Sequence, residues 1–209
     1  DSTVSRESYS TYLNAFAKGE YDILLGTQMV AKGLNFPNVT LVGVLQADNA
    51  MFFDDFRAYE RAFSLFTQVF GRSGRGINPG KAIIQTASPE NYVIKYAAAQ
   101  DYSGFFEKEI SIRKLMTYPP YCDIVVLGFV SNKKDLSIKA AKFALNILKE
   151  KSSQYNDVKF IALGPTPANV PVVSNKYRYR IILKTKNSNR FREFLNEIVN
   201  EFYISEKQC

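Results

Sequence analysis

The amino-acid sequence of 209 residues predicts an α/β fold with a parallel sheet, followed by a small α+β domain. In the first part, short apolar runs alternate with helical patterns, which is typical of a parallel sheet covered by helices on both faces. In the second part, three strand patterns and two helical patterns predict one sheet with two helices packed on it. Between the two parts, the sequence Tyr-Pro-Pro-Tyr at 118–121 ends the last helical pattern, because proline disfavours helical backbone.

Local periodicity defines the elements of the first part. Residues 54–70 carry aromatic side chains at helical spacing, as a helix buried on one face requires. Runs such as 39–45, which are apolar almost throughout, indicate buried strands. The predicted helices are 7–18, 54–70, 90–99 and 101–116, and the predicted strands are 22–25, 39–45 and 82–86.

Local sequence patterns also define the strands and helices of the second part. The segment 164–167, Gly-Pro-Thr-Pro, predicts a loop, because glycine and proline both interrupt regular structure. The predicted strands are 124–130, 158–163 and 177–184, and the predicted helices are 134–150 and 188–202.

Composition excludes several kinds of site. The sequence has no histidine, so neither a Ser-His-Asp triad nor a His-ligated metal can form. Cys122 and Cys209 are too few for a zinc site or a disulfide framework, and they indicate reduced intracellular thiols. No apolar run is long enough for a transmembrane helix, so we expect a cytoplasmic protein without a membrane partner. The start at Asp1, inside polar sequence, suggests a fragment of a longer protein.

The charge is distributed unevenly along the chain. Residues 1–117 contain 12 lysines and arginines and 12 acidic residues, whereas residues 118–209 contain 15 and 8, so the whole net charge of +7 belongs to the second part. Such a shift predicts modules with different partners. The predicted domains are therefore 1–100 and 118–209, joined by a connecting helix at 101–117.

The segment 71–76, GRSGRG, is a candidate phosphate-binding turn at the end of the long helix 54–70. Its glycines permit sharp turns, and the planar guanidinium groups of Arg72 and Arg75 suit phosphate. An arginine directed at a γ-phosphate stabilises the charge that develops during phosphoryl transfer. A solvated basic turn is the alternative interpretation, and the spacing alone does not decide between them.

The segment 26–33, GTQMVAKG, follows a predicted strand and opens a short helix. A glycine turn with a hydroxyl at a helix N-terminus can bind an anion, although an ordinary N-cap has the same sequence. It is not a Walker A loop, because G-x-x-x-x-G-K-[ST] occurs nowhere in the chain. No acidic motif of the Walker B kind is present either.

Taken together, GTQMVAKGLNFPNVTLVGVLQAD and DFRAYERAFSLFTQVFGRSGR resemble motifs V and VI of superfamily 2 helicases. Within that superfamily the chain is similar to the primosomal protein N′ (PriA) family of replication-restart DNA helicases. The similarity continues through Y-P-P-Y, L-G-P-x-P-A and K-Y-R-Y-R, and it covers nearly the whole chain. The resemblance implies that residues 1–100 are a second RecA-like helicase lobe and that 118–209 are a small C-terminal domain.

The resemblance also implies roles for single residues. In motif VI, Gln68, Arg72 and Arg75 are implied to be catalytic at the ATP γ-phosphate, with Gly71 and Asp48 beside the nucleotide. Asp48 follows a strand, where ligands of α/β sheets bind. Residues Arg57, Glu60 and Arg61 match a family stretch but could equally form a surface ion-pair cluster. The motif V residues implied to contact DNA are Gly26, Thr27, Gln28, Lys32 and Gly33.

The whole helicase implied by the resemblance needs parts that these residues do not contain. ATP and Mg²⁺ would be bound mainly by a first lobe that carries Walker A and B, and zinc by a cysteine-rich insertion outside this chain. The implied activity is ATP-dependent 3′ to 5′ movement on DNA for replication restart and primosome assembly. Rival hypotheses are a nucleic-acid-binding module with a degenerate lobe, and a DEAD-box RNA helicase.

The segment 176–180, KYRYR, is the candidate DNA-binding strand of the basic part. At strand period, Lys176, Arg178 and Arg180 share one face, and Tyr177 and Tyr179 share the other. Cations beside aromatic rings suit single-stranded nucleic acid, while an amphipathic strand with tyrosines half in the core is the alternative. The resemblance implies single-stranded and forked DNA, the acidic tail of the single-stranded-DNA-binding protein and other primosome proteins as partners.

Overall fold

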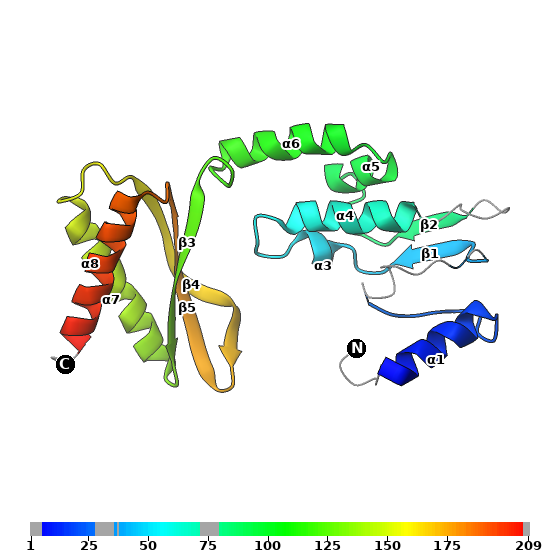
Figure 1. The fold of residues 1–209 in the computed structure, drawn as a ribbon, viewed down its shortest axis with the longest axis horizontal. Coiled ribbons are helices and arrows are strands. Elements are labelled where there is room, and N and C mark those ends of the chain that lie inside the picture. The colour runs from blue at the N-terminus through cyan, green and yellow to red at the C-terminus, as the bar shows by residue number, and fades with distance from the viewer. Residues whose placement is uncertain (1–5, 28–35, 37, 72–79, 207–209) are drawn as a thin grey trace. The chain divides into compact units, whose positions relative to one another are not determined.

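The computed structural model describes residues 6–27, 36, 38–71 and 80–206 (Figure 1). Two compact units make up the chain, Asp1–Glu109 and Ile110–Cys209. The division falls inside helix α6 (Tyr102–Leu115), in the segment where the sequence predicts a connecting helix. Among the described residues, none of the helices combines the length and the apolar composition needed to cross a bilayer.

The first unit contains a parallel pair of strands. Strands β1 (Leu41–Val44) and β2 (Lys81–Ile84) pair side by side in the same direction, as the alternation of strands and helices predicts. The helices of this unit are α1 (Arg6–Ala17), α3 (Asp48–Met51), α4 (Ala58–Phe70), α5 (Tyr92–Ala98) and the first part of α6.

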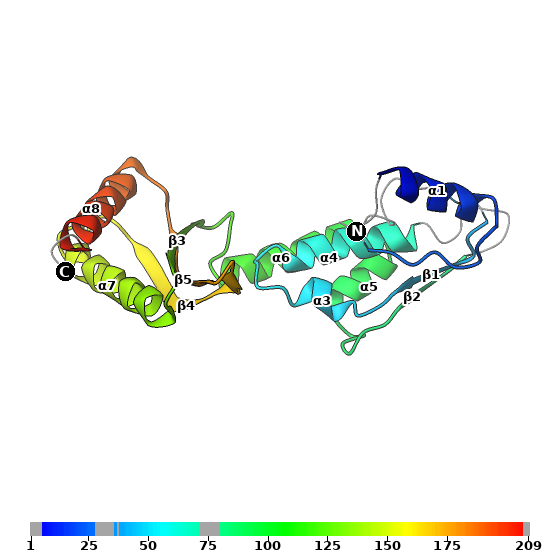
Figure 2. The ribbon, with the colours of Figure 1, turned by 90° about the horizontal axis from the view of Figure 1, so that it is seen from below.

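Helix α4 is the centre of this unit's core. Its buried face contains Phe63 and Phe66, which pack with Val93 and Ala97 of α5 and with Phe105 of α6. The rings of Phe63 and Phe105 stack with their centroids 4.1 Å apart. This face has the spacing that the sequence predicts, and Figure 2 shows α4 beside α5 in this unit.

Two predictions for the first unit are wrong. Residues 22–25 form no strand, and Ile23 and Leu25 are 84% and 82% exposed, because no neighbouring strand pairs with the run in this structure. Helix α4 begins at Ala58 rather than at 54, because Asp55 closes a turn in front of it. The carbonyl oxygen of Asp55 accepts the Ala58 N–H, and its carboxylate accepts the Arg57 N–H at 2.8 Å.

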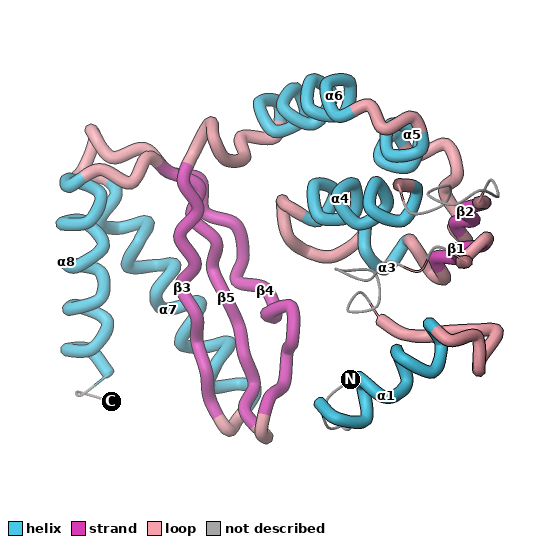
Figure 3. The backbone as a smooth tube through the Cα atoms, turned by 45° about the vertical axis from the view of Figure 1, so that its right-hand side comes forward, coloured by secondary structure: helices cyan, strands magenta, loops and turns pink. Residues whose placement is uncertain are grey.

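The second unit is an antiparallel sheet with two helices on one face, as predicted. Its strands lie in the order β3-β5-β4, and Figure 3 shows helices α7 and α8 on the same side of them. The elements are β3 (Asp123–Ser131), α7 (Lys134–Ser152), β4 (Phe160–Val173), β5 (Lys176–Thr185) and α8 (Asn189–Glu206).

The core of the second unit lies between the sheet and its helices. Ile181 and Leu183 of β5 pack against Phe191, Phe194 and other buried residues of α7 and α8. At the end of β5, the ammonium group of Lys184 donates to the Met116 carbonyl at 2.7 Å and lies 3.7 Å from the centroid of the Tyr118 ring. Lys184 is only 8% exposed, so this contact ties the segment after α6 to the sheet.

The loop predicted at 164–167 is wrong, because β4 continues through it. The strand passes the segment by shifting its register between Leu163 and Thr166 and again between Pro167 and Val172. Gly164 has a φ of 111°, which only glycine adopts without strain, and a Cβ there would lie 2.8 Å from the Arg180 carbonyl oxygen. The glycine and prolines therefore mark an irregular strand rather than a loop.

Candidate functional sites at a sheet edge and on a basic strand

Asp48 joins the carboxyl ends of the two parallel strands. It begins α3 directly after β1, and its carboxylate accepts the Thr86 hydroxyl at 3.0 Å and the Ala87 N–H at 2.9 Å, both beyond β2. The hydrogen bond from the Ala87 N–H is the main cause that holds the pKa of Asp48 below its ordinary value. Both oxygens thus have partners within the protein.

The same sheet edge has further side-chain hydrogen bonds, made by residues that the sequence analysis did not identify. The Gln46 N–H donates to the side-chain oxygen of Gln85 at 3.3 Å, and the side-chain amide of Asn49 donates to Gln46 at 3.0 Å. Gln46 has a φ of 51°, which turns the chain from β1 into α3. The signal that could have identified these residues is their position directly after two apolar strands.

The linkage between Asp48 and the strand ends gives a pH prediction. A carboxylate with a lowered pKa in the folded state stabilises the fold above its ordinary pKa, and this contribution is lost as the pH falls through the lowered value. Asp48→Asn keeps the shape but cannot accept both bonds, so we expect a lower melting temperature at neutral pH. The difference from the unmodified chain should shrink on acidification below pH ~4. A pH-independent difference in thermal melts would contradict this role.

The end of α4 positions the first residues of the predicted arginine turn. Gln68 is exposed in the last turn and donates to the Ser64 hydroxyl at 3.3 Å, and the Gly71 N–H donates to the Thr67 carbonyl at 2.9 Å. A Cβ at Gly71 would lie 3.2 Å from that same oxygen, so glycine fits the tight end of the helix. Arg72 and Arg75 lie outside the described residues.

The motif V segment is described only at its beginning. Gly26 and Thr27 are exposed and belong to no helix or strand. Gln28, Lys32 and Gly33 lie outside the described residues.

At the start of α4, two of the three candidate cluster residues, Arg57 and Arg61, make charged contacts. A guanidinium nitrogen of Arg61 lies 2.7 Å from the Asp55 carboxylate, and the guanidinium of Arg57 lies 5.1 Å from the centre of the Phe56 ring. Burial raises the pKa of Asp55, but hydrogen bonds from Arg57 and Arg61 and their charges lower it overall. These contacts support the interpretation of Arg57 and Arg61 as a surface cluster that fixes the start of the helix.

The basic strand β5 has the two faces that the sequence predicts. Lys176 and Arg178 are exposed and Arg180 is half-buried, on the face that points away from the helices. Tyr177 and Tyr179 are half-buried on the opposite face, which carries the buried Ile181 further along the strand. The cations and the tyrosines therefore point to opposite sides of the sheet.

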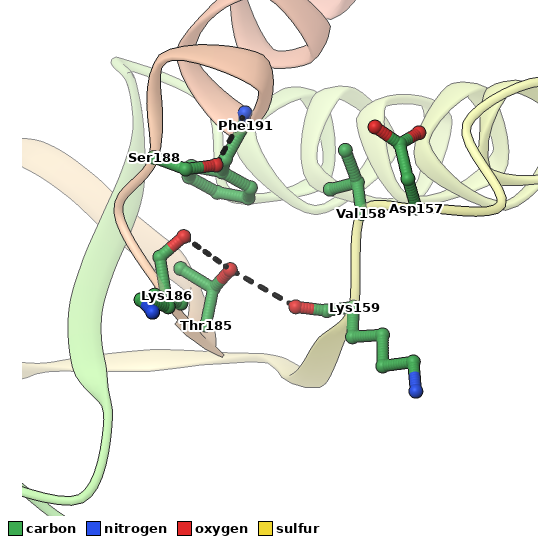
Figure 4. Close-up of a pocket in the computed structure, with 7 residues that line it drawn as sticks. All are labelled: Asp157, Val158, Lys159, Thr185, Lys186, Ser188 and Phe191. Carbon is green, nitrogen blue, oxygen red and sulfur yellow. Dashed lines mark hydrogen bonds between the residues drawn. The ribbon is translucent and has the colours of Figure 1, made fainter.

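A pocket of about 230 Å³ lies where the strands meet the start of α8 (Figure 4). The Thr185 hydroxyl on its wall donates to the Lys159 carbonyl at 3.0 Å, and the Ser188 hydroxyl accepts the Phe191 N–H at 3.1 Å. The Lys159 side chain extends away from Ser188 and Phe191. The hydroxyl groups of the pocket wall are thus used within the protein, Ser188 at the start of α8 and Thr185 between β5 and Lys159. Among the described residues, no three histidine, cysteine, aspartate or glutamate side chains gather to hold a metal ion.

Comparison with known proteins gives a match to each unit. The model of the helicase conserved C-terminal domain matches residues 1–76, and the model of the primosomal protein N C-terminal domain matches residues 114–207. The first match and the parallel strand pair confirm a RecA-like helicase lobe, as predicted, followed by an α+β domain.

Individual relatives match almost the whole chain. The replication restart protein PriA of Bacillus subtilis is 40% identical over 203 residues, which are 97% of this chain and 25% of that protein. PriA of Chlamydia muridarum is 36% identical over 99% of this chain and 27% of that protein. PriA of Borreliella burgdorferi is 36% identical over 94% of this chain and 29% of that protein. The chain spans about a quarter of the length of these curated relatives.

Proposed function

Because this chain belongs to the family of the replication restart protein PriA, we propose that it forms part of an ATP-dependent DNA helicase that moves 3′ to 5′ and assembles a primosome. One observation carries the proposal: a helicase domain and a primosomal protein N domain follow each other on one chain. The primosomal protein N domain argues against the rival hypothesis of a DEAD-box RNA helicase. We also propose a cytoplasmic location.

Within this proposal, α4 delivers the catalytic residues. Gln68 and Gly71 stand at its end, and Arg72 and Arg75 follow them in the sequence. We assign these arginines to the ATP γ-phosphate, where they stabilise the charge of the transferring phosphoryl group. ATP and Mg²⁺ would be held mainly by another lobe of the longer protein, and ATP hydrolysis supplies the free energy for movement.

Asp48 contributes to this site by positioning rather than by direct contact. Its two oxygens already accept hydrogen bonds from Thr86 and Ala87, so a nucleotide or a metal ion would have to displace them. We propose that Asp48 fixes the ends of β1 and β2 at the edge where ligands of α/β sheets bind.

The DNA-binding role is divided between the two units. We assign Gly26, Thr27, Gln28, Lys32 and Gly33 of motif V to the DNA backbone, and Lys176, Arg178 and Arg180 of β5 to phosphates of single-stranded or forked DNA. The excess of cations in residues 118–209 supports this, since lysine and arginine neutralise phosphates. The acidic tail of the single-stranded-DNA-binding protein and other primosome proteins are further proposed partners, and zinc is assigned to the longer protein.

The first test uses the 209-residue chain itself. It contains neither a Walker A loop nor a Walker B motif, which cradle the phosphates and hold Mg²⁺ in helicases of this kind. We expect no ATP hydrolysis and no strand separation by this chain, with or without single-stranded DNA, in a coupled phosphate-release assay. The full-length protein is the positive control. Steady turnover by the chain that survives further purification would contradict the division of the ATP site proposed here.

A further inference from the structure

One face of the β3-β5-β4 sheet lies opposite the face that packs on α7 and α8, and we call it the open sheet face. The buried residues of this unit lie on the helix side of the sheet. The register brings Val126, Ile182 and Leu163 into one row across the strands, and Gly128, Arg180 and Thr166 into the next. The residues of this face are Val126, Gly128, Val130, Ile161, Leu163, Thr166, Lys176, Arg178, Arg180 and Ile182.

The open sheet face is apolar and basic, and none of its residues is acidic. Val126 and Val130 on β3 are 53% and 57% exposed, and Ile161 and Leu163 on β4 are 51% and 43% exposed. Apolar residues exposed singly are ordinary, but a group that spans three adjacent strands marks an interaction site. The combination of aliphatic side chains and cations fits a ligand that has both negative charge and apolar surface.

The cations form a single line between the aliphatic side chains. Lys176, Arg178 and Arg180 follow each other at every second residue of β5, about 6.6 Å apart at about 3.3 Å per residue. That regular step is similar to the distance between successive phosphates of an extended nucleic-acid strand.

Gly128 opens space in the centre of this face. It pairs with Arg180 across the strands, and a Cβ built on it would meet no atom within 4 Å. Its backbone does not require glycine, since its φ lies outside the left-handed region. A glycine at this position therefore leaves open space beside Arg180 without being needed for the fold.

We propose that the open sheet face binds a single strand of nucleic acid that runs along β5. The phosphates lie on Lys176, Arg178 and Arg180, and the nucleosides lie against the aliphatic side chains and in the open space at Gly128. Tyr177 and Tyr179 do not stack on bases, because they point to the other side of the sheet. This inference rests on the proposed DNA binding of the basic strand and deepens it.

The test places a side chain in the open space at Gly128. Gly128→Val adds a side chain suited to a strand and leaves the charge unchanged, so the chain should fold with an unchanged or higher melting temperature. For oligothymidine we expect the affinity of Gly128→Val and of Leu163→Ser to fall about fourfold or more, the scale of about one buried methylene group. For an abasic strand of equal length, both variants should bind like the unmodified chain, and their salt dependence should stay the same.

Matched variants separate the outcomes. Val199→Ser removes a similarly exposed valine from α8 and should bind both strands normally. If Lys176, Arg178 and Arg180 are needed but Gly128→Val and Leu163→Ser bind oligothymidine normally, phosphate binding stands and the apolar contact is refuted. If the triple replacement of the cations by glutamine also has no effect, the proposed DNA function of this strand fails. Binding of a synthetic acidic amphipathic peptide, but not oligothymidine, through Leu163 would overturn the inference in favour of a protein partner.

Discussion

Arg72→Ala or Arg75→Ala in the full-length protein is expected to lower DNA-stimulated ATP turnover by about 10³-fold or more, which is the scale of arginine fingers. In the proposed mechanism, these guanidinium groups stabilise charge that develops in the transition state. The affinity for nucleotide and DNA should change much less. Arg→Lys at either position should restore little activity, since an ammonium group lacks the planar fork.

A control decides whether such a loss is specific. Lys142→Ala removes an exposed cation from α7, far along the chain from motif VI, and should leave ATP turnover unchanged. Steady-state turnover and equilibrium nucleotide binding should be measured on the same preparations. If both alanine variants at Arg72 and Arg75 hydrolyse ATP normally, the turn is structural, and the rival hypothesis of a nucleic-acid-binding module without a motor role gains support.

Replacing Lys176, Arg178 and Arg180 together by glutamine has the second large expected effect. The affinity of the 209-residue chain for single-stranded DNA should fall, and the slope of log K against log salt should flatten by about two, at about 0.7 per phosphate contact. The loss should be similar for all sequences, because phosphate contacts do not read bases. Titrations at several salt concentrations measure both quantities.

Tyrosine variants complete this experiment. Tyr179 pairs across the strands with Phe129, which packs on the core, so Tyr179→Ala should lower the melting temperature and leave DNA affinity nearly unchanged. A fall in affinity with an unchanged melting temperature would instead show that the ring contacts DNA. An unchanged salt slope in the triple variant would remove β5 from the DNA site, and the basic start of α8 would then be the next candidate.

An element of the fold can be predicted from the sequence where the periodicity of its own residues is sufficient to identify it. The aromatic positions of α4 and the alternation of β5 could be predicted because burial imposes a period on each element. The strand expected at 22–25 depends on pairing with a neighbour, which local sequence does not contain. At 164–167, proline and glycine are expected both in a loop and in an irregular strand, so the local sequence does not distinguish the two.

The candidate sites show the same difference. The two faces of β5 could be predicted, but the aliphatic surroundings of its cations could not, because Val126 and Leu163 come from strands far away in the sequence. Asp48 was identified by its place after a strand, whereas its partners Thr86 and Ala87 needed the pairing of β1 with β2. The roles of Arg72 and Arg75 rest on the resemblance and stay predictions.

Lys184 links the end of strand β5 to the segment that follows α6. The outer half of this strand carries the exposed cations, and at its other end Lys184 contacts the Met116 carbonyl and the Tyr118 ring, just after the last turn of α6. The segment that leaves α6 is therefore anchored on the same strand that carries the exposed cations.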